Sequence, residues 1–100
     1  MEGKIMRMFM RVKFDVEAAN RAIKDGSIGK IIEDFAKEFK PEGMWFVSQD
    51  GKRCMVAVFD LPSTSKIPPL AEPFFMGLGA TIEATPAMDL ADLQAGLAAL

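Results

Sequence analysis

The dipeptide Asp50-Gly51, set between two apolar runs, is the feature of this sequence that most restricts its fold. The stretch GMWFVSQDGKRCMVAVF, residues 43–59, contains two extended segments joined by this pair. Asp-Gly is typical of a two-residue type I′ hairpin turn, because both central residues of that turn need a positive φ. A turn of this length fixes the pairing, which joins Gln49 to Lys52, Val47 to Cys54, Phe46 to Met55, Trp45 to Val56 and Met44 to Ala57.

Both faces of this predicted hairpin are apolar. One face carries Met44, Phe46, Met55, Ala57 and Phe59, and the other carries Trp45, Val47, Cys54, Val56 and Val58. An antiparallel sheet with one face in water alternates between apolar and polar side chains, and this hairpin does not. We therefore expect both faces to be covered, one by helices of the same chain and the other by a second copy of the chain.

The stretch IMRMFMRVKF, residues 5–14, alternates with period two and is predicted to be a strand. Its apolar side faces the helices and consists of Met6, Met8, Met10, Val12 and Phe14. Its other side carries Arg7, Phe9, Arg11 and Lys13, three cations around one aromatic ring. Arginine stems pack on apolar surface while the guanidinium groups seek carboxylates, so Arg7 or Arg11 is expected to pair with Glu83 or to hold a ligand.

Capping residues divide the rest of the chain into helices. Asp15 caps a helix over 15–24, Gly26 ends it in a left-handed conformation, and Ser27 caps a second piece that ends before Pro41. The second piece has an apolar stripe formed by Ile28, Ile31, Ile32, Phe35 and Phe39. A short helix is expected to start near Pro69, because Pro73 limits how early it begins. A fourth strand over 80–85 and a terminal helix capped by Asp89, with Leu90, Leu93 and Leu97 on one side, complete the chain.

The order of these elements is β-α-β-β-α-β followed by a helix, which is the ferredoxin-like arrangement. One hundred residues are enough for one hydrophobic core and too few for two, so residues 1–100 are expected to form a single domain. The predicted fold class is α+β, an antiparallel sheet with helices on one face and a C-terminal helix.

This element order, with the segments IMRMFMRVKF, QDGKR and LAEPFF, resembles the small dimeric α/β-barrel proteins, and most closely uncharacterised bacterial members of that group. In those proteins two ferredoxin-like sheets pack face to face, so the resemblance implies a homodimer. Several members of the group degrade haem or isomerise lactones. No catalytic residue of theirs matches a position in this sequence, so the resemblance carries over the fold and not a reaction.

Composition excludes several kinds of chemistry. The chain contains no histidine, no tyrosine and one cysteine, which rules out histidine-based triads, histidine-ligated metals and cysteine clusters. No metal and no cofactor are predicted. A net charge of −2 disfavours nucleic-acid binding, and no apolar run is long enough for a membrane span. The lone cysteine is consistent with a reducing compartment, so a cytoplasmic, soluble protein is expected.

The sequence does not specify a biochemical function, but it does indicate where a ligand would bind. We expect a pocket between sheet and helices near Arg7, Phe9, Arg11, Trp45 and Glu72, because apolar walls with a few polar groups are typical of small-ligand sites. Glu72 has the alternative role of a carboxylate stabilised at a helix N-terminus. Two other functions stay open: a cofactor-independent oxygenase or isomerase of the dimeric-barrel type, and a structural or interaction module.

Overall fold

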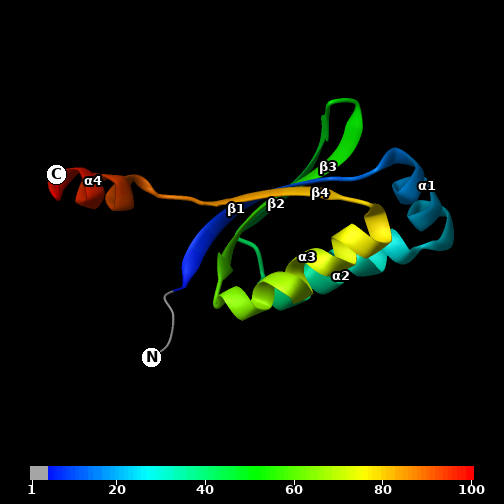
Figure 1. Ribbon diagram of the computed structural model, residues 1–100, viewed down its shortest axis with the longest axis horizontal. Helices are drawn as coiled ribbons and strands as arrows, with labels where there is room; N and C mark the ends of the chain where they lie inside the picture. The colour runs from blue at the N-terminus through cyan, green and yellow to red at the C-terminus, as the bar shows by residue number, and fades with distance from the viewer. Residues whose placement is uncertain (1–4) are drawn as a thin grey trace.

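Four strands form one antiparallel sheet in the order β2-β3-β1-β4 (Figure 1). The computed structural model describes residues 5–100. Its elements follow the predicted order: β1 (Met6–Lys13), α1 (Val16–Asp25), α2 (Ser27–Phe39), β2 (Gly43–Gln49), β3 (Lys52–Leu61), α3 (Ile67–Leu78), β4 (Thr81–Pro86) and α4 (Leu90–Ala98). A single turn of 3₁₀ helix, Thr64–Lys66, leads into α3. The predicted α+β class, with its antiparallel sheet and added terminal helix, is confirmed.

The predicted hairpin is present with the predicted register. Asp50 and Gly51 have φ values of 54° and 74°, and Gln49 pairs with Lys52 and Trp45 with Val56. Lys13 of β1 reaches the turn and places its Nζ 3.0 Å from Asp50 Oδ2. Local turn chemistry therefore sets the alignment of the whole β2–β3 pair.

Helices α1 and α2 are two parts of one crossover broken at Gly26, as predicted. Asp15 Oδ2 accepts a hydrogen bond from Ala18 N at 2.9 Å, and Gly26 has a φ of 83°. The predicted cap at Ser27 is wrong. Ser27 is already the first residue of α2, and the cap position is held by Gly26, which has no side chain to accept a hydrogen bond. The free backbone N–H of Ser27 donates instead to Asp25 Oδ1 at 2.8 Å.

Helix α3 begins at Ile67, two residues before the predicted start, and so contains Pro73 in its interior. Pro68 and Pro69 lie in the first turn, where a missing N–H breaks no helical bond. Pro73 has no N–H, so the hydrogen bond to the carbonyl four residues earlier in the helix is lost. Burial of Leu70, Phe74 and Leu78 against the sheet offsets that loss, so packing decides where this helix begins.

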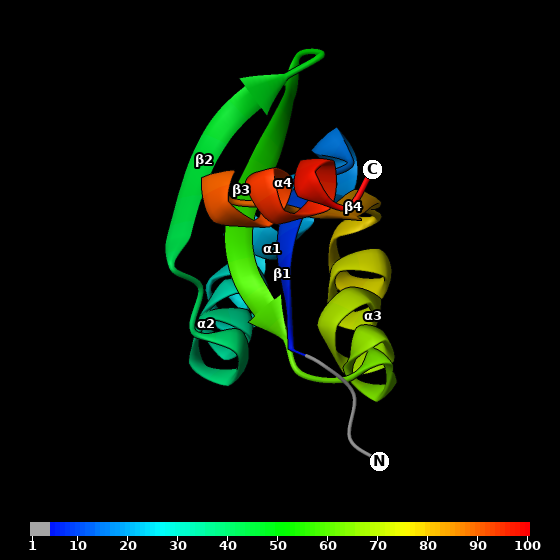
Figure 2. The same cartoon turned by 90° about the vertical axis from the view of Figure 1, so that its left-hand side faces the viewer.

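The core lies between the sheet and helices α1, α2 and α3, which cover one face (Figure 2). Met10 and Val12 of β1 are fully buried there, which confirms the predicted apolar side of the first strand. Aromatic rings fill the space between α2 and the sheet: the Phe35 ring centroid lies 5.6 Å from that of Phe59 and 5.9 Å from that of Phe74, both edge to face. This packing leaves the other face of the sheet without a helix among residues 5–100.

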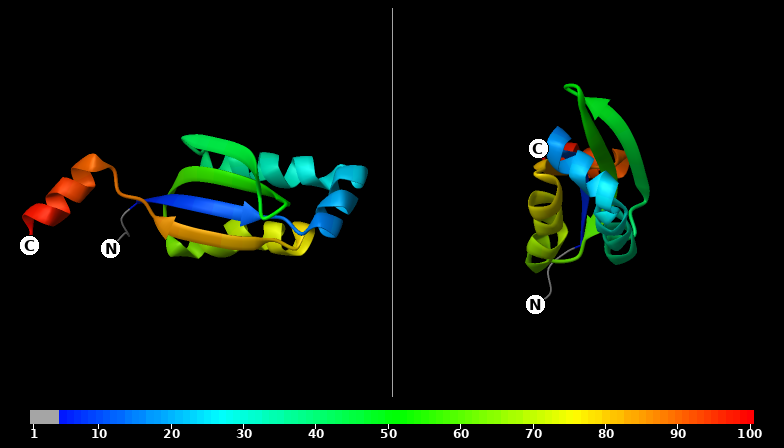
Figure 3. Two further views of the ribbon diagram at one scale, coloured as in Figure 1. Left: turned by 90° about the horizontal axis from the view of Figure 1, so that it is seen from above. Right: turned by 90° about the vertical axis from the view of Figure 1, so that its right-hand side faces the viewer.

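Two segments extend beyond this core. Phe46 points to the helix side of the hairpin but remains 55% exposed, because the hairpin tip curls away from the layer formed by α2 and α3. Helix α4 continues outward from the end of β4 and has no buried residue (Figure 3). The radius of gyration is 15.2 Å, above the roughly 13 Å usual for a compact chain of this length. The terminal helix thus forms as predicted, with its cap at Asp89, but none of its residues is buried within residues 5–100.

Candidate functional site

The uncovered face of the sheet holds four of the five residues predicted to bind a ligand. Strand register arranges its side chains in rows that cross the sheet. The central row runs from β2 to β4 through Trp45, Val56, Arg11 and Glu83, and its neighbours run through Gly43, Val58, Phe9 and Thr85 and through Val47, Cys54, Lys13 and Thr81. The β2–β3 half of this open face is apolar, while the β1–β4 half carries the charges.

Arg11 is loosely held at the centre of the open face. Its Nη1 lies 3.6 Å from Glu83 Oε1, which is an ion pair but too long for a good hydrogen bond. Its Nε is buried and has no hydrogen-bond partner within the described residues. The guanidinium carbon lies 5.3 Å from the centre of the Phe9 ring. The expected pairing of an arginine with Glu83 is confirmed, and the pair leaves donors of Arg11 unsatisfied.

Arg7 is held more firmly, by two carboxylates that sequence reasoning did not identify. Its Nε donates to Glu42 Oε1 at 2.8 Å, and its Nη1 lies 3.5 Å from Asp89 Oδ2. The hydrogen bond to Glu42 is the main reason that the pKa of Arg7 is raised. Glu42 lies in the loop before β2 and Asp89 caps α4, so both partners come from segments distant in sequence. Arg7 is a structural clamp in this chain.

Trp45 lies on the apolar half and is 56% exposed. Its indole covers Gly43, where an added Cβ would collide with the ring. Val56 and Val58 are half-buried beside it, while Cys54 is only 1% exposed. Burial raises the pKa of the Cys54 thiol, so this cysteine is poorly suited to act as a nucleophile.

A hollow of about 240 Å³ opens beside Arg11 on this face. Phe9, Arg11, Glu83, Ala84 and Thr85 line it, so it joins an aromatic wall to one cation and one carboxylate. Glu72 does not belong to this group. It is an exposed residue of α3, which covers the opposite face of the sheet, so the five predicted residues do not meet between the sheet and the helices.

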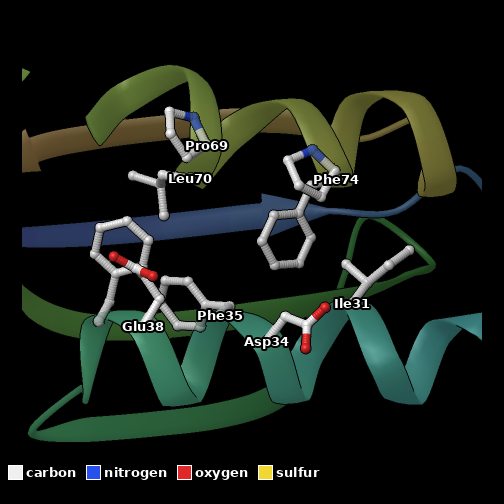
Figure 4. Close-up of a pocket in the computed structure, with 9 residues that line it drawn as sticks. Ile31, Asp34, Phe35, Glu38, Pro69, Leu70 and Phe74 are labelled. Carbon is white, nitrogen blue, oxygen red and sulfur yellow. The ribbon is translucent and has the colours of Figure 1, made fainter. Parts of the chain in front are cut away.

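A second hollow, of about 260 Å³, lies between α2 and α3 (Figure 4). Its floor is apolar, with Phe35, Leu70 and Phe74, and Asp34 and Glu38 stand at its rim. These two carboxylates pair with Lys30 at 3.1 Å and Lys66 at 3.2 Å. None of the predicted ligand-binding residues lines this groove. Both carboxylates are exposed on the outer side of α2.

Within residues 5–100, no group of three or more acidic, cysteine or histidine side chains is placed to hold a metal ion. None of the helices described is both long and apolar enough to cross a bilayer. Comparison of the chain with protein-family models, curated proteins and solved structures gives no significant match.

Proposed function

We propose that this protein is a homodimer whose two open sheet faces pack together, and that it binds a small anionic ligand with an apolar body beside Arg11. The observation that carries the proposal is the composition of the open face. An apolar half next to a loosely paired arginine is an arrangement that a single chain leaves exposed and a sheet-on-sheet dimer would cover.

The apolar half supports the dimer. Trp45 and Val47 are both exposed, and they lie beside the half-buried Val56 and Val58. A contiguous apolar patch on a sheet is typical of an association surface. Two such faces pack about 10 Å apart in β-sandwiches and barrels, which leaves no room for water between the larger side chains. This is the face-to-face packing of the α/β barrels that the sequence resembles.

The charged half supports the ligand. An arginine with free donors suits a carboxylate, which it can bind with two parallel hydrogen bonds. The Phe9 ring next to it offers an apolar wall for the rest of the molecule. A second sheet over the hollow would exclude water and strengthen the hydrogen bond to the anion. The anion would have to compete with Glu83 for Arg11, and the 3.6 Å separation of that pair makes Glu83 a weak competitor.

Light scattering at micromolar concentration tests the assembly. The expected mass is that of two chains. Val47→Asp places a charge in the apolar half and should convert the protein to a single chain, whereas Met76→Asp, at an exposed apolar side chain of α3 on the covered side of the sheet, should not. A wild-type protein of one chain at this concentration would contradict the proposed dimer.

Thermal melting with a panel of small aromatic and aliphatic carboxylic acids tests the ligand. A ligand that binds the folded state raises the melting temperature, with a stabilisation that grows with the logarithm of its concentration relative to its dissociation constant. At least one acid should stabilise the wild type and Arg7→Met but not Arg11→Met. Arg7→Met is the matched control, since it makes the same change on the same face at an arginine already held by two carboxylates. If no acid stabilises the wild type, or if Arg11→Met responds equally, the binding proposal is wrong.

The same samples separate binding from catalysis. Liquid chromatography coupled to mass spectrometry should recover each stabilising acid unchanged after prolonged incubation if the site only binds, and the retention time reveals isomers of equal mass. Formation of product would favour the alternative of a cofactor-independent oxygenase or isomerase.

A further inference from the structure

We infer that α4 of one chain docks on a second copy of the chain, in the groove between α1 and the tip of the β2–β3 hairpin. This inference rests on the homodimer proposed above and adds a second contact to it.

Helix α4 is built to pack on something. Its leucines recur at positions 90, 93 and 97, which places them along one face, and all three are exposed. The helix is nevertheless well formed, with a capping box in which Asp89 Oδ1 accepts from Asp92 N at 2.8 Å and Asp92 Oδ2 accepts from Asp89 N at 3.1 Å. A capped helix of nine residues is marginal in isolation, so its leucine face needs a partner surface.

The groove supplies an apolar floor with a basic rim. It measures about 420 Å³ and is lined by Val16, Phe46, Val47, Ser48, Gly51, Lys52 and Arg53. Val16, Phe46 and Val47 are exposed there in the single chain. Neither Lys52 nor Arg53 takes part in an ion pair among residues 5–100, although Arg53 Nη2 donates to Asn20 Oδ1 at 3.0 Å.

Charge selects this groove over the one between α2 and α3. Residues 87–100 contain Asp89 and Asp92 and no lysine or arginine, so the terminal segment is an acidic helix with a leucine face. Lys52 and Arg53 attract such a helix. Asp34 and Glu38, at the rim of the α2–α3 groove, are already paired with Lys30 and Lys66, so that rim offers no net positive charge to an acidic helix.

Helix α4 cannot reach the groove of its own chain. The hairpin tip and α1 lie at one end of the sheet and α4 leaves from the other, on a molecule 51 Å long (Figure 1). A two-fold axis that lies between two packed sheets and runs perpendicular to their strands places opposite ends of the two sheets together. Helix α4 of each copy then lies beside the hairpin tip of its partner, and the two exchanged contacts are equivalent by symmetry.

Cross-linking between single-cysteine variants tests this exchange. In a Cys54→Ala background, Leu97→Cys marks the helix and Lys52→Cys marks the groove, and both positions are exposed. A short bis-maleimide added to an equimolar mixture of the two variants should give a product of two chain masses that contains one of each. The same reagent should give no such product when Asp34→Cys, at the rim of the α2–α3 groove, replaces Lys52→Cys.

Other products would overturn the inference. A Leu97→Cys homodimer as the main product would mean that the two terminal helices meet each other, as they would about an axis parallel to the strands. An internal link in a chain that carries both changes, with no product of two masses, would mean that the helix folds back on its own chain. Light scattering of the uncross-linked samples separates the two proposals: a two-chain mass without the mixed product refutes the docking alone, and a one-chain mass refutes the dimer and the docking together.

Discussion

Arg7 Nε lies 2.8 Å from Glu42 Oε1, and the same guanidinium reaches to 3.5 Å from Asp89 Oδ2. One side chain thus joins the start of β1 to the loop before β2 and to the cap of α4. Among residues 5–100, Arg11, on the same face of the same strand, has Glu83 as its one ion-pair partner, at 3.6 Å. Two arginines that look equivalent in the sequence therefore have different roles in the structure.

Replacing Arg7 by methionine should lower the melting temperature by no more than a few degrees. Both of its carboxylate partners are exposed to water, where ion pairs contribute little and are screened by salt. The deficit relative to wild type should shrink as sodium chloride rises to about 1 M, where the screening length is about 3 Å. A decrease in melting temperature that is large and independent of salt would contradict this, and would show that Arg7 stabilises the fold by packing of its aliphatic stem and not by its ion pairs.

Acidification should destabilise the first turn of α4. The pKa of Asp89 is lowered, chiefly because the backbone N–H of Asp92 donates to its carboxylate, and Arg7 adds to the effect. A carboxylate with a lowered pKa stabilises the folded helix above its usual titration range and loses that effect as the pH falls through its own pKa. The amide-exchange protection factors of Asp92 and Leu93, followed by NMR from about pH 6 downwards, should fall once the pH drops below the ordinary aspartate pKa of about 3.9. Asp89→Asn, which still caps but does not titrate at this position, should show a weaker response.

Cys54 should react slowly with a thiol reagent such as Ellman's in the native protein. The side chain is 1% exposed, and burial raises its pKa, so little thiolate is present near neutral pH. Labelling in denaturant should be complete within the dead time of mixing, while native labelling should follow the rate of local opening. Rapid, stoichiometric labelling of the native protein would contradict the burial of this thiol.

The only tryptophan of the chain, Trp45, should report on the open face. It is half exposed in a single chain, and the proposed dimer covers it, so its emission maximum should lie at shorter wavelength in wild type than in the Val47→Asp variant. Dilution of wild type toward the dissociation constant should shift the emission toward that of the variant. Identical spectra at all concentrations would place Trp45 outside any interface.

A matched pair of glycine substitutions should change stability in opposite directions. An added Cβ meets nothing within 4 Å at Gly51 or at Gly29, but Gly51 has a φ of 74° and Gly29 lies in helix α2. Gly51→Ala should cost about 1–2 kcal/mol, the penalty of a left-handed conformation for a residue with a Cβ. Gly29→Ala should gain up to about 1 kcal/mol from its helix propensity. Urea unfolding of both variants measures the difference.

Features decided by neighbouring residues could be predicted from the sequence. The Asp50-Gly51 turn sets the register of the hairpin through the positive φ angles of its two central residues. Asp15 and Asp89 cap their helices by binding backbone N–H groups three residues away. The Arg11–Glu83 pair could also be predicted, because the ferredoxin-like order makes β1 and β4 neighbours. In each case a short stretch of chain contains all the chemistry that matters.

Features decided by distant packing could not be predicted. Helix α3 starts early because burial of Leu70 and Phe74 outweighs the lost bond at Pro73. The partners of Arg7 lie 35 and 82 residues away, in a loop and at a helix cap whose positions depend on the finished fold. Sequence pattern identified the leucine face of α4, but it contains nothing to show that the helix would stand clear of its own core.

Strand β1 acquires its two neighbours at different times while the chain is being made. Strand β3 ends at Leu61 and β4 begins only at Thr81, and domains fold as synthesis proceeds at roughly 5–20 residues per second. For about 1–4 s a nascent chain can therefore hold a paired β1–β3 ladder whose other edge is bare. Bare edges recruit other strands, and cations along them oppose this by repulsion. In such a chain Arg7 and Lys13 can already pair with Glu42 and Asp50, whereas Arg11 stays without its carboxylate partner until Glu83 is made.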